Sequence, residues 1–135
     1  MLNIGPKPDG TITDEETQVL KELGDWMKLN GEGLYGTTFW KQFGEGDVNN
    51  EEGFFKDREE KAFTENDFRF TYKRGSIYAF QMRPNGENAV IKVLKKHNPH
   101  DFIIKRITLL STSEALKFER NDNELIIKAN ENFNN

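Results

Sequence analysis

The sequence contains no cysteine among its 135 residues, which removes disulfide bonds, thiol nucleophiles and cysteine-ligated zinc from consideration. Its two histidines, His97 and His100, are separated by Pro99, which interrupts any helix that would align them as metal ligands. We interpret this segment as a solvated turn rather than a metal site, and we expect neither a metal nor another cofactor.

Long apolar runs and an excess of basic charge are also missing. No apolar run approaches the roughly 18 residues that cross a membrane, and the first residues lack the basic-then-apolar pattern that directs export. The net charge of −4 disfavours binding to nucleic acid, because contact with phosphates requires a basic face. We therefore expect neither a membrane nor a nucleic acid among the partners.

The best-specified local feature is a helix from about Asp14 to Asn30. Thr13 is placed to cap its first turn, and Glu16 is placed to reach back to the Thr13 amide, which is a capping box. Glu15 adds favourable charge at the same end of the helix. Capping accounts for these carboxylates better than a cluster for acid/base chemistry or metal binding. Gly31 stands where a left-handed C-cap belongs.

One face of this helix is apolar and needs a partner. Its apolar residues repeat with helical spacing, and they are Val19, Leu20, Leu23, Trp26 and Met27. The segment Leu2–Ile4 before it reads as a short strand, so the start of the chain is one strand-turn-helix unit. Such units occur in multiples around parallel sheets, and here there is only one. We expect this piece to fit a larger scaffold.

The rest of the chain changes to a period of two, which is typical of strands. Residues 43–62 are rich in polar residues and glycine and are predicted to form a surface linker. Phe68, Phe70 and Tyr72 then share one face of a strand, and Arg74 with Gly75 turns the chain into a hairpin. The predicted strands are 67–73, 76–82, 89–94, 102–110, 115–119 and 124–129. This spacing, together with 11 phenylalanines, predicts an antiparallel β-sandwich over residues 63–135.

Two passages carry a resemblance to a known family. The segments LNIGPKPDGTI (2–12) and LGDWMKLNGEGLYGT (23–37), with Trp40 in register, resemble the α-L-fucosidases of glycoside hydrolase family 29. FTENDFRFT (63–71) and IYAF (77–80) resemble that family's entry into its C-terminal β domain. The resemblance implies a (β/α)8-like catalytic barrel followed by a β-sandwich. Residues 1–42 would then be the closing strand, last helix and exit loop of the barrel.

By this resemblance, the chain is expected to be the C-terminal segment of a retaining glycoside hydrolase that is exported and acts on fucosylated glycans. The family's catalytic groups lie upstream of the part matched here, so we predict no catalytic residue in this chain and no activity of the chain alone. Its expected role is to support the catalytic barrel, which would be its partner. The exposed helix face would also favour self-association.

Two candidate sites and two other functions stay open. Asn3 would lie at the carboxyl end of the last barrel strand, where it would contact substrate, although an asparagine that satisfies loop backbone is the simpler interpretation. Phe39 and Trp40 would stack on a sugar in a carbohydrate-binding module, but burial of both residues between helix and sandwich is favoured. The alternatives to the enzyme segment are therefore a stand-alone carbohydrate-binding sandwich and a purely structural or assembly module.

Overall fold

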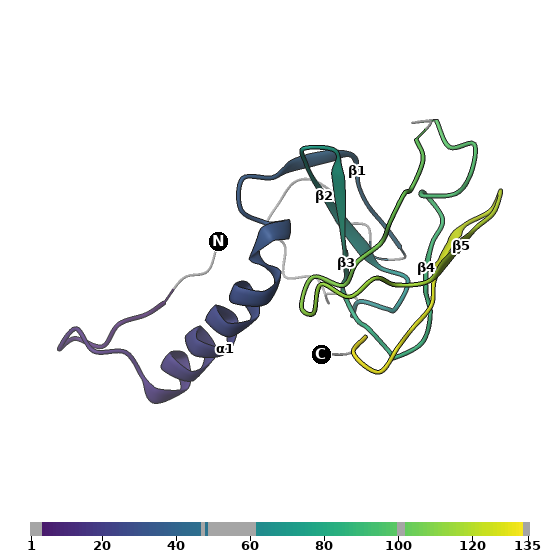
Figure 1. Ribbon diagram of the computed structural model, residues 1–135. Coiled ribbons are helices and arrows are strands. Elements are labelled where there is room, and N and C mark those ends of the chain that lie inside the picture. Colours follow the sequence, from purple (N-terminus) through teal and green to yellow (C-terminus); the bar gives the residue numbers. More distant parts are fainter. Residues whose placement is uncertain (1–3, 47, 49–61, 100–101, 134–135) are drawn as a thin grey trace.

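The part of the chain that the structure describes forms two small antiparallel sheets with one α-helix that projects from them (Figure 1). The computed structural model describes residues 4–46, 48, 62–99 and 102–133. One sheet has the strand order β1-β2-β3 and the other β4-β6-β5. The elements are α1 (Asp14–Asn30), the 3-10 helix η1 (Gly31–Gly33), β1 (Thr38–Glu45), β2 (Phe68–Lys73), β3 (Ser76–Gln81), β4 (Ala89–Ile91), β5 (Phe118–Arg120) and β6 (Leu125–Ile127). The predicted fold class, a mainly β antiparallel sandwich that follows a helix, is confirmed.

Helix α1 begins and ends where the sequence predicts. The Glu16 amide donates to Thr13 Oγ1 at 3.1 Å and the Thr13 amide donates to Glu16 Oε2 at 3.1 Å, so the capping box is confirmed. The prediction of a left-handed C-cap at Gly31 was wrong, because Gly31 has a φ of −61°, in the right-handed region. Its amide donates a helical hydrogen bond to the Met27 carbonyl. The chain continues into η1 instead. Of the predicted first strand, Leu2 and Asn3 lie outside the described residues.

The hairpin β2–β3 follows from two residues with positive φ. Arg74 has a φ of 50° and Gly75 a φ of 87°, which is the conformation that matches the twist of a tight antiparallel hairpin. Pairing runs from Phe68 opposite Gln81 to Lys73 opposite Ser76, as the alternation predicts.

Strand β1 was not predicted and changes the start of the linker. Residues Thr38 to Glu45 pair with β2, with an irregularity between Phe39 and Gly44. The expectation of a linker from residue 43 was therefore wrong for residues 43–45, which belong to β1. Most of the remaining linker, residues 49–61, lies outside the described residues.

The core lies between the two sheets and is largely aromatic on one side. Trp40 is buried and makes edge-to-face contacts with Phe70 and Phe102, at centroid distances of 5.5 and 6.2 Å. Trp40 is thus buried as predicted, but in the sandwich rather than against the helix. The predicted burial of Phe39 was wrong, because Phe39 is 80% exposed on the opposite face of the strand. The buried apolar residues are Trp40, Phe68, Phe70, Ala89, Ile91, Leu94, Leu125 and Ile127.

The second sheet is shorter than predicted. The predicted strand 102–110 was wrong, because its described residues make one isolated bridge, Thr108 to Ala115, and no strand. Arg120 fixes this irregular region, since its guanidinium donates to the carbonyl oxygens of Leu94, Phe102 and Lys95 at 2.7, 2.8 and 2.8 Å. Its charge also lies 4.9 Å from the centroid of the Phe102 ring.

Candidate docking surface

The buried carboxylate in the described part of the chain has a structural role. Asp67 is fully buried and accepts hydrogen bonds from the Thr64 amide at 2.7 Å, the Thr64 hydroxyl at 2.9 Å and the Val48 amide at 2.9 Å. Burial raises the pKa of Asp67, but these hydrogen bonds and the nearby charge of Arg69 hold the pKa below its ordinary value. Asp67 is therefore an ionised anchor for the chain before β2, and a poor general acid.

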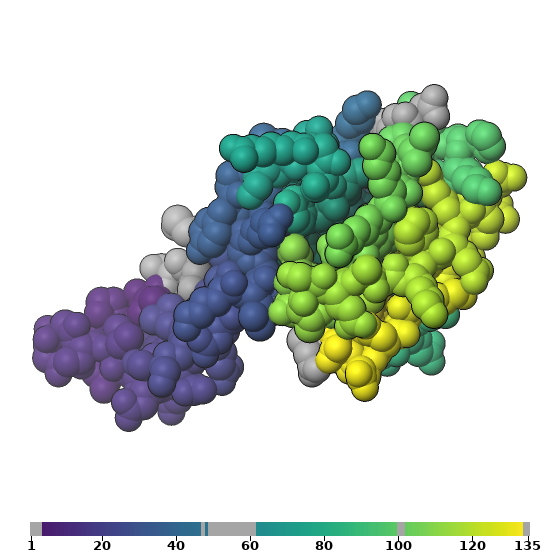
Figure 2. Space-filling view, viewed as in Figure 1, coloured from purple at the N-terminus to yellow at the C-terminus, as the bar shows by residue number. Residues whose placement is uncertain are grey.

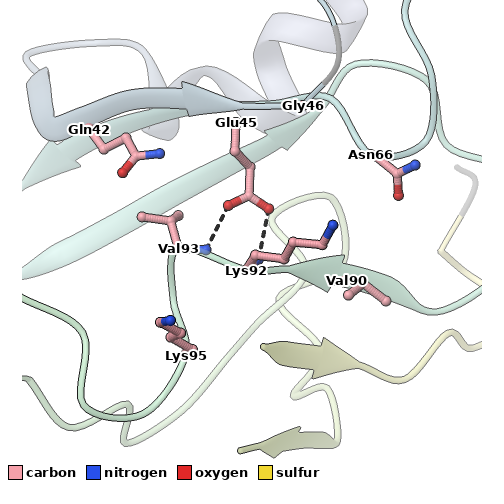
Figure 3. Close-up of a pocket in the computed structure, with 8 residues that line it drawn as sticks. All are labelled: Gln42, Glu45, Gly46, Asn66, Val90, Lys92, Val93 and Lys95. Carbon is pink, nitrogen blue, oxygen red and sulfur yellow. Dashed lines mark hydrogen bonds between the residues drawn. The ribbon is translucent and has the colours of Figure 1, made fainter. Parts of the chain in front are cut away.

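A polar cleft opens between the two sheets, and its carboxylate also joins structural elements (Figure 3). The cleft has a volume of about 490 Å³. Glu45, on β1, accepts hydrogen bonds from the amides of Lys92 and Val93, just after β4, at 2.8 and 2.7 Å. This carboxylate therefore ties one sheet to the other. Retaining glycosidases need two carboxyl groups about 5 Å apart, and Glu45 is the only carboxylate lining this cleft among the described residues.

The remaining residues weighed as candidate sites in the sequence are His97, His100 and Asn3. His97 lies in an exposed turn, with Nε2 at 3.7 Å from Asp122 Oδ1, while His100 and Asn3 lie outside the described residues. Within residues 4–46, 48, 62–99 and 102–133, no group of three or more His, Asp or Glu side chains is placed to hold a metal. In the same part of the chain, no helix has the length and apolar character to span a membrane.

Helix α1 presents an apolar face that the sandwich does not cover. None of its 17 residues is buried. Val19 is 55% exposed and Leu23 41%. Figure 2 shows the helix as an arm beside the β body, with its N-terminal half out of contact with the sheets in this view. Exposed apolar side chains gathered on one helix face are typical of an interaction surface.

A groove marks the centre of this face. It has a volume of about 370 Å³, and its lining residues are Leu20, Leu23, Gly24, Met27, Lys28 and Tyr35. Gly24 leaves open space above the helix, because an added Cβ would meet no atom within 4 Å. The lining is thus apolar with one cation at its edge. We call this set of residues the α1 groove.

The C-terminal end of α1 is held firmly on the outer face of the sheet β1-β2-β3. Tyr78 Oη donates to Glu32 Oε1 at 2.8 Å, and Lys73 Nζ donates to the carbonyl oxygens of Glu32 and Tyr35 at 3.2 and 2.9 Å. Burial, followed by the bond to Glu32 and its charge, raises the pKa of the Tyr78 hydroxyl. Trp26 packs against Phe80 with ring centroids 6.1 Å apart. The α1 groove is therefore presented in a fixed direction.

Close approach at this joint depends on Gly33. A Cβ at position 33 would lie 2.7 Å from Phe80 Cζ and 3.2 Å from Tyr78 Cδ1. The Gly33 carbonyl also accepts a hydrogen bond from the Thr71 hydroxyl on β2. Any larger residue here would require Phe80 to move, so the contact between η1 and the sheet needs glycine.

Comparisons with known proteins identify the relationship. The profile of the alpha-L-fucosidase family matches residues 1–32. A crystal structure of Thermotoga maritima alpha-fucosidase superposes on 98% of this chain and 26% of that protein, with 29% identity and a TM-score of 0.69. The chain is related to the α-L-fucosidases. It matches the C-terminal part of glycoside hydrolase family 29, as the resemblance indicated.

Curated relatives agree with this. Human plasma alpha-L-fucosidase is 44% identical over 41 residues, which is 30% of this chain and 9% of that protein. The alpha-L-fucosidase of Branchiostoma floridae is 25% identical over 119 residues, which is 87% of this chain and 22% of that protein. The chain thus spans about a quarter or less of the length of these relatives. The stretch matched by the family profile, residues 1–32, includes α1.

Sequence reasoning identified the apolar face of α1 but missed two parts of this surface. Tyr35 completes the α1 groove from a loop that follows the helix. Phe39 and Phe43 stand exposed on β1, a strand that was not predicted. The sequence analysis named Phe39 as a candidate, but the segment TFWKQFGE does not alternate between apolar and polar residues, so it gave no signal for a strand.

Proposed function

We propose that this chain is the barrel-supporting segment of an α-L-fucosidase-like glycoside hydrolase and that it hydrolyses no fucoside by itself. The observation that carries the proposal is the apolar face of α1, which has no buried residue although the sandwich beside it has a complete core. An amphipathic helix gains most of its stability by packing that face against another layer. The missing layer is, on this proposal, the catalytic barrel.

The comparisons support this choice of partner. The T. maritima enzyme contains a counterpart of 98% of this chain, and that counterpart is 26% of its length. About three-quarters of such an enzyme therefore lies outside the matched part. The helix that carries the α1 groove is within the stretch matched by the family profile. A segment of the enzyme outside the match is thus the natural occupant of the groove.

Inactivity of the chain alone is supported by the roles of its carboxylates. Asp67 and Glu45 hold backbone amides, and Glu16 caps α1. A retaining mechanism needs one carboxyl as nucleophile and a second as acid and base, both facing one substrate. The carbohydrate-binding alternative is weaker than it was from the sequence, because Trp40 is inside the core and offers no face to a sugar.

A pair of assays tests the proposal. The purified chain is incubated with a chromogenic α-L-fucoside, and the same assay is applied to a chimera in which this chain replaces the matched C-terminal segment of T. maritima alpha-fucosidase. We expect no turnover above a buffer blank from the chain and measurable turnover from the chimera. Hydrolysis by the chain alone, or a chimera that neither folds nor turns over substrate, contradicts the proposal.

A further inference from the structure

The outer face of the sheet β1-β2-β3 is covered on one half only. On β2 and β3, Thr71, Lys73, Tyr78 and Phe80 contact the end of α1 and the residues that follow it. On β1, Phe39 is 80% exposed and Phe43 is 56% exposed. Their ring centroids are 6.1 Å apart in an edge-to-face arrangement. Two neighbouring exposed phenylalanines on a rigid strand are unusual unless something binds them.

Arg69 holds one member of this pair, Phe43, in place. Its guanidinium lies 5.4 Å from the ring centroid of Phe43 and 5.4 Å from that of Phe63. The same group donates to the carbonyl oxygens of Phe68 and Val48 at 2.8 and 3.1 Å. Arg69 and Phe43 are therefore already ordered in the free chain. Binding to such a surface loses little side-chain entropy, which favours affinity.

The composition and geometry favour a protein partner over a sugar. Aromatic residues and arginine are enriched in the energetically dominant parts of protein interfaces. Phe39 and Phe43 are inclined at 66° and Arg69 lies over the ring of Phe43, so the two rings do not form one flat platform for a sugar. We call Phe39, Phe43 and Arg69 the β1 patch.

We infer that the β1 patch is a second contact site for the same barrel partner that covers the α1 groove. This inference rests on the proposed function. The two sites are joined by short, fixed connections: Tyr35 lines the groove, its carbonyl is held by Lys73, and Phe39 pairs with Thr71 on the same strand as Lys73. Thr71 and Lys73, the β2 residues in these connections, both bond the residues that follow α1. A partner that covers the groove and continues across η1 reaches β1.

The charges around the β1 patch specify the partner's surface further. Lys41 is exposed on the same strand, and Arg69 lies within the patch. The barrel surface opposite is therefore expected to offer an apolar socket with carboxylates at its rim.

The chimera described above separates this inference from the proposed function. Phe39→Ala is compared with Leu23→Ser in the groove and with Ile103→Ala, a control at a side chain that is 84% exposed and lies outside both sites. Each variant is measured in the chimera and in the isolated chain. We expect Phe39→Ala to speed thermal inactivation of the chimera by about tenfold and to leave unfolding of the isolated chain unchanged. Phe39→Tyr should retain the wild-type rate.

The outcomes are distinct. If Leu23→Ser destabilises the chimera while Phe39→Ala behaves as Ile103→Ala does, the β1 patch is not a contact and the proposed function still stands. If the wild-type chimera neither folds nor turns over fucoside, both ideas fail. NMR titration of the isolated chain with L-fucose covers the remaining case, because specific shifts at Phe39 and Phe43 would make the patch a sugar site and overturn a protein contact.

Discussion

The β-sandwich and helix α1 differ in how completely each is packed. In the sandwich, Phe70 and Ile91 are 1% and 0% exposed, and carboxylate and guanidinium groups hold the strands and loops together. Helix α1 has well-formed ends and no buried residue. A sequence can therefore specify a helix completely at the local level and still leave its main source of stability to another layer.

The largest expected effect compares a residue of the sandwich core with a residue on the exposed face of α1. Phe70→Ala removes a ring from the core and should lower the free energy of unfolding by about 3–5 kcal/mol. Leu23→Ala, on the exposed face of α1, should change it by less than about 1 kcal/mol, because little contact is lost. Urea unfolding followed by fluorescence measures both. Equal losses would mean that the helix face is packed in solution, by self-association or by folding back.

Next in size is the loss of Arg120. Arg120→Met removes three hydrogen bonds to carbonyl oxygens and a contact with the Phe102 ring. We expect a loss of about 2–3 kcal/mol in the free energy of unfolding, since the acceptors are left without donors. Arg106→Met, at an exposed position, is the matched control and should cost under about 0.5 kcal/mol. A similar small loss at both positions would refute the role assigned to Arg120.

Acid should act on the sandwich through Asp67. The folded state lowers the pKa of Asp67 below its ordinary value of 3.8, so the unfolded chain binds the proton more readily. The stabilisation is present above that ordinary pKa and is lost as the pH falls through the lower, folded pKa. Asp67→Asn should be less stable at neutral pH but lose less stability on acidification below roughly pH 5.

The matched control for this titration lies on the helix. Asp25 also has a lowered pKa, through its hydrogen bond and charge interaction with Lys28, but the pair is exposed. Asp25→Asn should therefore leave the pH dependence of sandwich unfolding unchanged. Circular dichroism melts between pH 2 and pH 7 measure both variants, and parallel curves for Asp67→Asn and the wild type would exclude Asp67 as the acid-sensitive group.

The smallest expected effect is confined to α1. Thr13→Ala removes the N-cap and should destabilise the helix by about 1 kcal/mol, while the global unfolding midpoint stays where it was. Hydrogen exchange should show faster exchange of the first-turn amides. Thr17→Ala, one turn later, is the control and should not speed exchange, since alanine is the better helix former. A fall in the global midpoint with Thr13→Ala would show that helix and sandwich unfold together.

The features predicted correctly from sequence are those fixed by residues close together in the chain. Thr13 and Glu16 define the helix start within four positions, and Arg74 with Gly75 defines the hairpin. Strand β1 was missed because it pairs with β2 across a long polar segment, and its sequence, TFWKQFGE, does not alternate between apolar and polar residues. Residues 102–110 alternate like a strand but lack a partner strand over most of their length among the described residues.

The candidate docking surface also contains a part that the sequence predicted and a part that it did not. The apolar face of α1 follows from helical spacing and was predicted. The position of Tyr35 at the groove and of Arg69 over Phe43 depends on how the chain folds back, and spacing in the sequence does not encode it. The catalytic dyad was predicted to be absent, and the observed uses of Asp67 and Glu45 give those two carboxylates structural roles instead.

The contact at Gly33 determines the direction of the whole helix α1. A helix of 17 residues is about 25 Å long, and its only anchorage to the sheets, among the described residues, is at the end nearest Gly33. One additional methyl group there would require either Phe80 or η1 to shift, and a shift of η1 would change the direction of the helix that precedes it. The direction in which the exposed face of α1 points, and hence its fit to any barrel, thus depends on having glycine at position 33.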